Sequence, residues 1–479
     1  MPVTTTHRRY NEHSAQWQRL RDAFAGQDAV KRNDRQEDYL PRLEGQKGEF
    51  SDDYTMYLFR SLWTGFSQRT LAGIVGAVFR KDPKMTFPDA DREWLEDITL
   101  TGQSMIDFAR LAFREVMALN WAGVLVDMMG EEHSLPEERR PTLQFYRAEA
   151  IRNWRIEPRN GKPTLTQVVL HETFDEPAKD KFGTEQGDQY RVLSLDTKTT
   201  ISAAGISSVS SFYTQQLWRK QRTADNREEW RPFGPIIIPH RKGDPLPHIP
   251  FFPLSVNGQE FRLEPSRLLD LVDVNYDHYR LDADYKHGLH FTALPTVWMA
   301  GFPVDGTYRI GSQVAWVSEN PAARAGFAEF SGSGLNAILD AKASDERLMA
   351  VLGARLLEES KRAVEASEAI QLRQAGEESI VKTAARAVSA VLSTALYTMA
   401  WWGGQDTPEA GIQLNTDIVA AQMSPTMITA LLGALQANHI SERTFLEALV
   451  TGEVVQGRTW EEEQELIALT DPAGDMEVA

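Results

Sequence analysis

Residues 264–402 restrict the possible folds more strongly than any other segment, because they place a short insertion between two long helical segments. Residues 264–290 carry apolar side chains three and four positions apart, which is typical of a helix with one buried face. Pro265 suits the first turn of that helix. Residues 291–331 divide into short strand-like pieces, and a helical pattern resumes at about Leu335. The expected buried stripe of the first helix is Leu268, Leu271, Val272, Tyr276 and Tyr279.

The second helical segment changes character part-way along. Residues 356–402 contain no proline and one glycine, Gly376. Residues 358–378 are rich in charge and the following residues are apolar at helical spacing, so we expect a long helix with one solvated half and one buried half. Gly376 costs about 1 kcal/mol relative to alanine inside a helix, which makes it a candidate for a kink or for the true helix start. The expected buried positions are Ile380, Ala384, Val388, Val391, Ala395 and Met399, with Trp401 and Trp402 anchoring the end.

Residues 51–263 combine helical and strand patterns. We expect a helix that buries Leu71, Ile74, Val75, Val78 and Phe79 and holds Arg80 and Lys81 in its last turn. A second helix is expected over residues 102–121. A buried strand at 122–129 and alternating segments up to residue 220 predict an antiparallel sheet. The proline-rich residues 234–258 are expected to form an extended connection.

The charge balance argues against a protein that simply coats nucleic acid. The formal net charge is −17. Residues 405–479 hold 13 aspartates and glutamates against two arginines, a net charge of −11. This acidic module of short helices is expected either to be a solvated surface or to recruit a basic partner.

Composition also limits the chemistry. The chain has no cysteine, which excludes disulfides, cysteine-ligated zinc and thiol nucleophiles. It shows neither a signal peptide nor an apolar run long enough to span a bilayer, so we expect no membrane partner. Phosphate-binding loops, zinc-protease helices and nucleophile elbows are absent from the sequence.

Two groups of side chains leave minor alternatives open. His287 and His290 can share a helical face, but no second ligand pair stands nearby to complete a metal site. The aspartates between residues 270 and 284 could gather two magnesium ions for phosphodiester cleavage. Arg280 and Lys286 interrupt them, which favours a solvated face or ion pairs between subunits. We therefore expect no enzymatic activity and no cofactor.

Four segments together resemble a family of tailed-phage portal-type proteins found in phages and prophages. The resemblance covers most of the chain, roughly residues 35–465, and none of its motifs is a catalytic signature. The segments are YLPRLEGQ (39–46), RTLAGIVGAVFRKDP (69–83), HFTALPT (290–296) and MAVLGARLLEESKRAVEASEAIQLRQAGEES (349–379).

The resemblance implies an α+β, mainly helical portal fold. Its parts would be an N-terminal arm (1–50), an α/β wing (51–263), a first stem helix (264–290), a small β-containing clip (291–331), a second stem helix (332–358), a tunnel loop with a long tunnel helix (359–404) and an acidic helical crown (405–479).

The resemblance also implies where function would reside. Residues near the tunnel loop would contact DNA in a channel, although they could instead form surface ion pairs with one another. The clip would dock partners, although core packing is the alternative for its tryptophans. The implied tunnel-loop residues are Glu358, Glu359, Ser360, Lys361 and Arg362. The implied stem residues are Asp277, Arg280, Asp284 and Lys286, and the implied docking residues of the clip are Trp298, Tyr308, Arg309 and Trp316.

A portal of this kind would be a homo-oligomeric ring, expected to be a dodecamer, at one capsid vertex of a virion assembled in the bacterial cytoplasm. Double-stranded DNA would pass through it during packaging and ejection. Its partners would be the terminase large subunit, a head–tail adaptor, and capsid and scaffold proteins. The alternatives are a head–tail connector or another virion scaffold, a metal-dependent nuclease built on the aspartates, and an ordinary monomer with an amphipathic helix.

Overall fold

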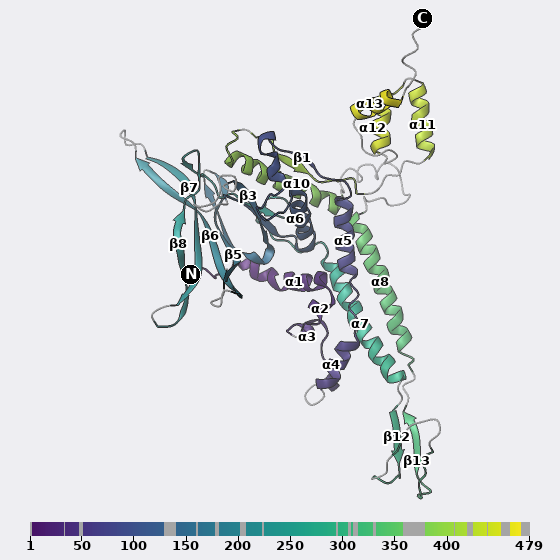
Figure 1. The fold of residues 1–479 in the computed structure, drawn as a ribbon. Coiled ribbons are helices and arrows are strands. Elements are labelled where there is room, and N and C mark those ends of the chain that lie inside the picture. The colour runs from purple at the N-terminus through teal and green to yellow at the C-terminus, as the bar shows by residue number, and fades with distance from the viewer. Residues whose placement is uncertain are drawn as a thin grey trace. The chain divides into compact units, whose positions relative to one another are not determined.

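The structure, a computed structural model, is drawn in Figure 1. The described residues fall into two compact units, Met1–Asn415 and Thr416–Ala479. The residues left undescribed are 1, 33, 47–50, 129–139, 160, 178–181, 202–206, 223–224, 294–295, 305–307, 310–314, 329–331, 358–378, 407, 419–424, 438, 452–459 and 471–479.

The core of the first unit is built on helix α6 (Met105–Leu119) and a three-stranded antiparallel sheet. The Ser104 hydroxyl caps α6 by accepting a hydrogen bond from the Asp107 backbone N–H at 3.2 Å. Strand β2 lies in the middle of the sheet and is buried on both faces, so its sequence is almost continuously apolar, as expected. The strands are β2 (Ala122–Met128), β3 (Pro141–Arg147) and β11 (Phe251–Leu254), in the order β11–β2–β3.

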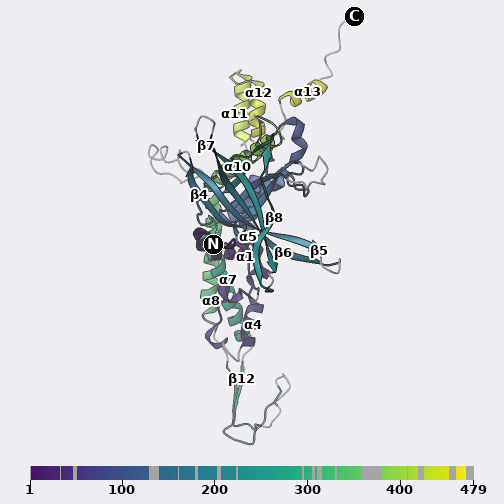
Figure 2. The same cartoon turned by 90° about the vertical axis from the view of Figure 1, so that its left-hand side faces the viewer.

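A five-stranded antiparallel sheet of long, consecutive strands follows in the chain (Figure 2). The predicted antiparallel sheet is therefore confirmed. Pro232 and Pro235 lie in its edge strand β8, where proline is tolerated. The strands are β4 (Ile151–Arg159), β5 (Lys162–Pro177), β6 (Thr184–Ile201), β7 (Ser207–Arg222) and β8 (Glu228–Ile237). The short pair β9 (His240–Arg241) and β10 (Asp244–Pro245) lies in the connection to β11.

Residues 8–25, expected within a polar arm, form helix α1 (Arg8–Ala25), which packs into the first unit. It is amphipathic, and its apolar side chains face α5, α6 and α7. The buried residues include Tyr10, Trp17, Leu20 and Phe24. The helices that follow are α2 (Gln27–Val30), α3 (Gln36–Tyr39), α4 (Ser51–Arg60) and α5 (Phe66–Val78). The short 3₁₀ helices among the described residues are η1 (Glu44–Gln46), η3 (Asp89–Leu95) and η5 (Ala148–Ala150).

Helix α5 buries four of the five predicted positions, with Phe79 half-buried, and it ends earlier than expected. Its last residue is Val78, and Phe79 is the C-cap. Arg80 and Lys81 therefore follow the helix instead of occupying its last turn. The chain then turns into strand β1 (Lys84–Thr86).

Two long helices, α7 (Leu269–Ala293) and α8 (Leu335–Leu357), flank a small antiparallel pair of strands, β12 (Thr296–Ala300) and β13 (Arg324–Ala328). Both views place the strand pair beyond the ends of the two helices (Figures 1 and 2). Within the described part of residues 291–331, the strand-like segments around Tyr308 and Trp316 are not strands.

Helix α7 begins at Leu269 and not near Pro265, because the preceding backbone is held elsewhere. The Asn120 side-chain amide donates to the carbonyls of Glu264 and Pro265 at 3.4 Å. The Ser266 hydroxyl accepts from Leu268 N–H at 3.1 Å. The predicted stripe of α7 is buried at all five positions, Leu268, Leu271, Val272, Tyr276 and Tyr279.

Helix α10 (Ile380–Trp402) starts later than the long helix expected within residues 356–402. Ser379 has an extended backbone, with φ −52° and ψ 134°, so a helix cannot run through it. The predicted apolar face is buried except at Ile380, which is half-buried. It packs against α6, β2, β3 and β11.

The second unit contains α11 (Pro425–Gln436), α12 (Glu442–Thr451) and α13 (Trp460–Thr470). Ser441 caps α12 by accepting from Thr444 N–H at 3.1 Å. This unit begins at Thr416, later than the expected crown at 405, because strand β14 (Gly411–Gln413) pairs with β1 in the first unit. Among the described helices, none combines the length and apolar character needed to cross a membrane.

Candidate functional site

Helices α7 and α8 pack in an antiparallel register, and we call this pair the stem. Gly288 near the end of α7 meets the start of α8, since a Cβ on Gly288 would lie 2.6 Å from Leu335 Cδ2. At the other end, Leu271 Cδ1 lies 3.9 Å from the position of a Cβ on Gly353. The absence of side chains at both glycines lets the helices approach closely.

Asp282 lies at the centre of the stem and is buried, although the sequence places it off the buried stripe. Its carboxylate accepts hydrogen bonds from Lys342 Nζ at 2.5 Å, Lys286 Nζ at 3.0 Å and the Leu62 backbone N–H at 2.9 Å. Burial by itself would raise the pKa of Asp282. The donors from Lys342 and Lys286 outweigh burial, and the pKa is lowered. This cluster ties α7 to α8 and to the segment after α4.

Three of the four residues predicted for the stem form hydrogen bonds or ion pairs with other residues of the same chain. Arg280 Nε donates to the Tyr39 carbonyl at 3.0 Å. Asp284 accepts from the Tyr57 hydroxyl at 2.5 Å. Lys286 belongs to the cluster just described. These three side chains therefore join α7 to α3, to α4 and to its own preceding turn.

The fourth predicted stem residue, Asp277, is exposed, and its charge acts on Asp345 of α8. Burial, and then the Asp277 charge, raise the pKa of Asp345. Asp345 Oδ2 is buried and has no hydrogen-bond partner in the described part of the chain. The neighbouring His278 turns inward, with Nε2 3.2 Å from Glu346 Oε1. Asp345 was not among the predicted site residues, although its spacing from Ala341 and Leu348 places these three residues on the same face of α8.

The aspartates between residues 270 and 284 do not converge. Asp273 pairs with Arg19 of α1 at 2.7 Å, Asp284 contacts α4, and Asp277 faces α8. Within the described residues, no group of three or more histidines, aspartates or glutamates is arranged to hold a metal ion.

The two histidines near the end of α7 have partners of other kinds. His290 Nε2 lies 3.1 Å from an Arg60 guanidinium nitrogen. The His287 ring lies edge-on to Tyr57 and Phe291, with centroid distances of 5.1 and 4.7 Å. Burial lowers the pKa of His287, and the Arg60 charge lowers it further.

Strands β12 and β13 form a hairpin-like tip whose apolar side chains are uncovered in a single chain. Trp298 pairs with Gly326 across the strands, and a Cβ on Gly326 would lie 3.0 Å from the Trp298 indole nitrogen. Even so, Trp298 is 45% exposed and Phe327 is 52% exposed. We call these two side chains, together with Val317, the tip patch; the register places Trp298 and Phe327 on opposite faces of the strand pair, so the name denotes the exposed apolar side chains of the tip and not one continuous surface.

Two of the other residues predicted for docking form hydrogen bonds within the tip. The Tyr308 hydroxyl donates to the Pro303 carbonyl at 2.9 Å. The Trp316 indole N–H donates to the Arg309 carbonyl at 2.7 Å. Tyr308 and Trp316 are half-buried and the Arg309 side chain is exposed. The structure therefore brings all four predicted residues, Trp298 included, into the tip.

The residues expected in the tunnel loop lie outside the described residues. Their described neighbours show where that segment is attached. The Ser379 hydroxyl donates to the Leu356 carbonyl at 3.0 Å, and both residues are buried. The last turn of α8 and the first turn of α10 therefore lie side by side. The undescribed tunnel-loop residues are Glu358, Glu359, Ser360, Lys361 and Arg362.

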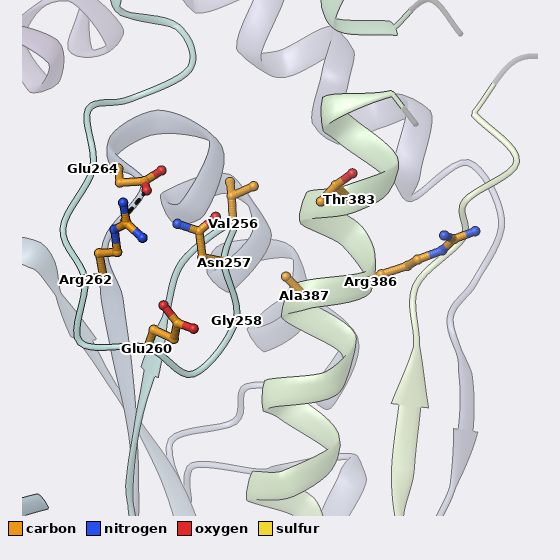
Figure 3. A pocket seen from close by; sticks show the side chains of 9 residues that line it. All are labelled: Val256, Asn257, Gly258, Glu260, Arg262, Glu264, Thr383, Arg386 and Ala387. Atoms are coloured by element: carbon orange, nitrogen blue, oxygen red, sulfur yellow. Dashed lines mark ion pairs between the residues drawn. The ribbon is translucent and has the colours of Figure 1, made fainter. Parts of the chain in front are cut away.

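A pocket of about 650 Å³ lies between α10 and the loop before α7 (Figure 3). Arg262 pairs with Glu264 at 3.4 Å, and Arg386 points away from this loop. Arg267 also pairs with Glu264, at 3.3 Å. The lining contains no histidine, serine or lysine, and its charged side chains do not converge on one point. The lining residues are Val256, Asn257, Gly258, Glu260, Arg262, Glu264, Thr383, Arg386 and Ala387.

Comparison with protein families matches residues 267–403 to a family described as "Domain of unknown function (DUF4055)". These residues span the stem, the tip and α10. A search of curated proteins finds no match.

Three similar solved structures belong to gene transfer agent (GTA) particles. One, described as "Neck of empty GTA particle computed with C6 symmetry", is 12% identical with a TM-score of 0.36, covering 88% of this chain and 97% of that chain. "Virion of native gene transfer agent (GTA) particle" is 13% identical with a TM-score of 0.36, covering 84% and 93%. "Neck of native GTA particle computed with C12 symmetry" is 11% identical with a TM-score of 0.35, covering 82% and 92%. These sequence identities and TM-scores do not assign a function to the chain.

Proposed function

We propose that the chain is the subunit of a ring-shaped portal of a phage-like particle, through which double-stranded DNA passes. The observation that carries the proposal is the stem with its tip. Both keep large apolar side chains uncovered in a single chain: Leu348 (46% exposed) and Val351 (45%) on α8 of the stem, and the tip patch at the tip. Exposed apolar side chains that lie together on a surface mark contacts with another chain. The sequence segments that resemble portal-type proteins include residues of the stem and the tip.

The charge of the chain suits a conduit better than a binder. A protein that grips DNA releases many counterions and holds it tightly. A net charge of −17 instead disfavours tight binding and leaves the DNA free to slide. The ring would be non-enzymatic and hold no cofactor, and a separate terminase would supply ATP hydrolysis.

The tip would be the docking surface for the terminase and later for a head–tail adaptor. Replacing Trp298 and Phe327 with alanine should leave rings intact but reduce terminase binding at least tenfold, because the tip patch loses its aromatic anchors. A matched control is Val209→Ala, an exposed apolar residue (67%) on β7. Normal terminase binding by the double variant would contradict the role of the tip patch.

Imaging tests the function as a whole. Negative-stain images of the purified full chain should show rings of about a dozen subunits. In virions, labelled chains should occupy a single capsid vertex, and deleting the gene should abolish DNA packaging. Heads that fill with DNA in its absence would instead indicate a connector or scaffold added after packaging.

The tunnel-loop residues give a second functional test. Changing Lys361 and Arg362 to glutamate should leave rings intact but impair packaging or DNA retention, since two cations that could touch passing DNA become anions. Reversing two exposed cations of the five-stranded sheet, Lys198 and Arg222, is the matched control. Normal packaging by the loop variant would show that these residues do not face the DNA.

A further inference from the structure

One side of the stem is only partly covered in a single chain. On each helix the residues of this side are spaced alternately by three and four positions, so they share a face. None of them is fully buried. On α7 they are Asp270, Val274, Asp277 and Leu281. On α8 they are Ile338, Ala341, Asp345, Leu348 and Leu352. We call these two rows the acidic face.

Two carboxylates at the middle of the acidic face, Asp277 and Asp345, form no ion pair with a described residue, and the His278 charge offsets only part of the rise in the pKa of Asp345. Asp277 lies close enough to Asp345 for its charge to disfavour ionisation of Asp345. Asp345 Oδ2 is shielded from solvent without a hydrogen bond from the described residues. A buried acceptor of this kind normally has a donor, and a carboxylate pair is best satisfied by a cation.

The opposite side of α8 carries such a cation. Arg347 follows Asp345 by two positions, which places it about 200° around the helix. It is exposed and forms no ion pair with any described residue. The small residues in line with it leave room for another helix to approach closely. The row runs through Asp340, Ala343, Arg347, Ala350 and Ala354, and we call its part from Ala343 to Ala354, whose one charged side chain is Arg347, the basic face.

We infer that the acidic face of each subunit packs against the basic face of the next, with Arg347 of a second copy bound between Asp277 and Asp345. The inference rests on the proposed ring. A rotation about a ring axis leaves every residue at its own level along that axis. Asp345 and Arg347 are about 3 Å apart along α8, so their side chains meet at one level in neighbouring copies.

The two faces suit a ring better than a two-fold dimer. A cyclic ring joins two different surfaces of the same chain, here one acidic and one basic. A two-fold contact through the acidic face would set aspartates against aspartates. In the ring, Leu348 and Leu352 of one copy would lie beside Ala350 and Ala354 of the next, which would bury apolar area around the ion pair.

Charge reversal tests the pairing on the full chain. Arg347→Glu and Asp345→Arg should each lower the fraction of assembled rings at least tenfold in native mass spectrometry at fixed protein concentration. The double variant, Arg347→Glu with Asp345→Arg, should restore assembly. Controls are Lys198→Glu on β6 and Asp175→Arg on β5, which reverse exposed charges of the five-stranded sheet, outside the stem, and should assemble normally.

The outcomes separate this inference from the proposed function. Wild-type rings with normal assembly of both single variants, or with no rescue in the double variant, overturn the pairing and leave the portal intact. A wild-type chain that stays monomeric overturns the portal itself. If Arg347→Glu reduces helicity by circular dichroism, Arg347→Gln replaces it. That milder variant should weaken assembly with unchanged helicity, and full assembly would overturn the pairing.

Discussion

Asp282 shows how a single buried carboxylate can hold the stem together. Replacing it with asparagine should destabilise the fold by about 2–3 kcal/mol at pH 7, because Lys342 would keep its charge in a mostly buried position without an anion. Asp340→Asn, at an exposed site on α8, is the control and should change stability by less than about 0.5 kcal/mol. The midpoint of urea unfolding at fixed protein concentration measures both.

The pH dependence of the same variant follows from the direction of the pKa shift. The pKa of Asp282 is lower in the folded chain than its ordinary value of 3.8. The stabilisation is therefore complete above the unfolded pKa and is lost as the pH falls through the folded pKa. Wild type and Asp282→Asn should therefore differ in stability at pH 7, and this difference should disappear as the pH falls below 3.8 and through the folded pKa. If the difference in unfolding free energy between the two proteins stays the same across this pH range, the carboxylate is not the stabilising group.

Two glycines should respond to alanine in opposite directions. A Cβ at Gly123 would overlap the Phe251 ring in the core, so Gly123→Ala should cost about 1–3 kcal/mol through overpacking. Gly76, on α5, has no atom within 4 Å of its Cβ position, so Gly76→Ala should stabilise by up to about 1 kcal/mol. Thermal unfolding midpoints check both, and shifts of the same sign would contradict the packing described.

The sequence could predict buried apolar positions but not the partners of charged ones. The stripe from Leu268 to Tyr279 follows from helical spacing alone. Asp282 looks like a solvated residue in the same pattern, because Leu62 and Lys342, which satisfy it, are far away in the sequence. Arg280 is misleading for the same reason, since its partner is a backbone carbonyl on α3.

Arg241 stabilises the C-terminal end of helix α10. Arg241 Nε donates to the Trp401 carbonyl at 2.7 Å, and another guanidinium nitrogen donates to the Gln405 carbonyl at 2.9 Å. The guanidinium also stacks on the Trp401 ring, 4.4 Å from its centroid. The first contact caps a carbonyl in the last turn of α10, and the second holds the segment that follows the helix.

Arg241→Ala should therefore destabilise the fold by about 2–3 kcal/mol and speed hydrogen exchange in the last turns of α10. Arg241→Lys should fail to rescue, because an ammonium cannot reach two carbonyls and stack at once. The control is Lys242→Ala, whose exposed pair with Asp406 at 2.8 Å should contribute little. Equal exchange in all three variants would show that the cap is dispensable.

Periodicity predicted which face of α10 is buried, but not where the helix begins. The break at Ser379 depends on a backbone conformation and on a hydrogen bond to Leu356, and neither leaves a periodic signal. Strand β13 was missed for a related reason. Its sequence, RAGFA, lacks the alternation and β-branched residues that mark strands, and it is defined by pairing with β12.

For the whole chain, the order of elements was predictable and the surfaces between copies were not. The helix–insertion–helix order can be read from residues 264–402 and from the resemblance to portal-type proteins. The acidic and basic faces needed the register of α7 against α8, because only that register brings Asp277 beside Asp345. The packed helix α1 also needed the structure, since its polar sequence resembles an arm.

Native mass spectrometry of the purified full chain, at micromolar concentration and physiological salt, is the decisive measurement. A closed ring predicts one narrow species of about a dozen copies, because uncovered stem surfaces are satisfied only when the last copy meets the first. A chain that remains a single copy across this concentration range would contradict the ring, and with it the assignment of the stem as a shared wall.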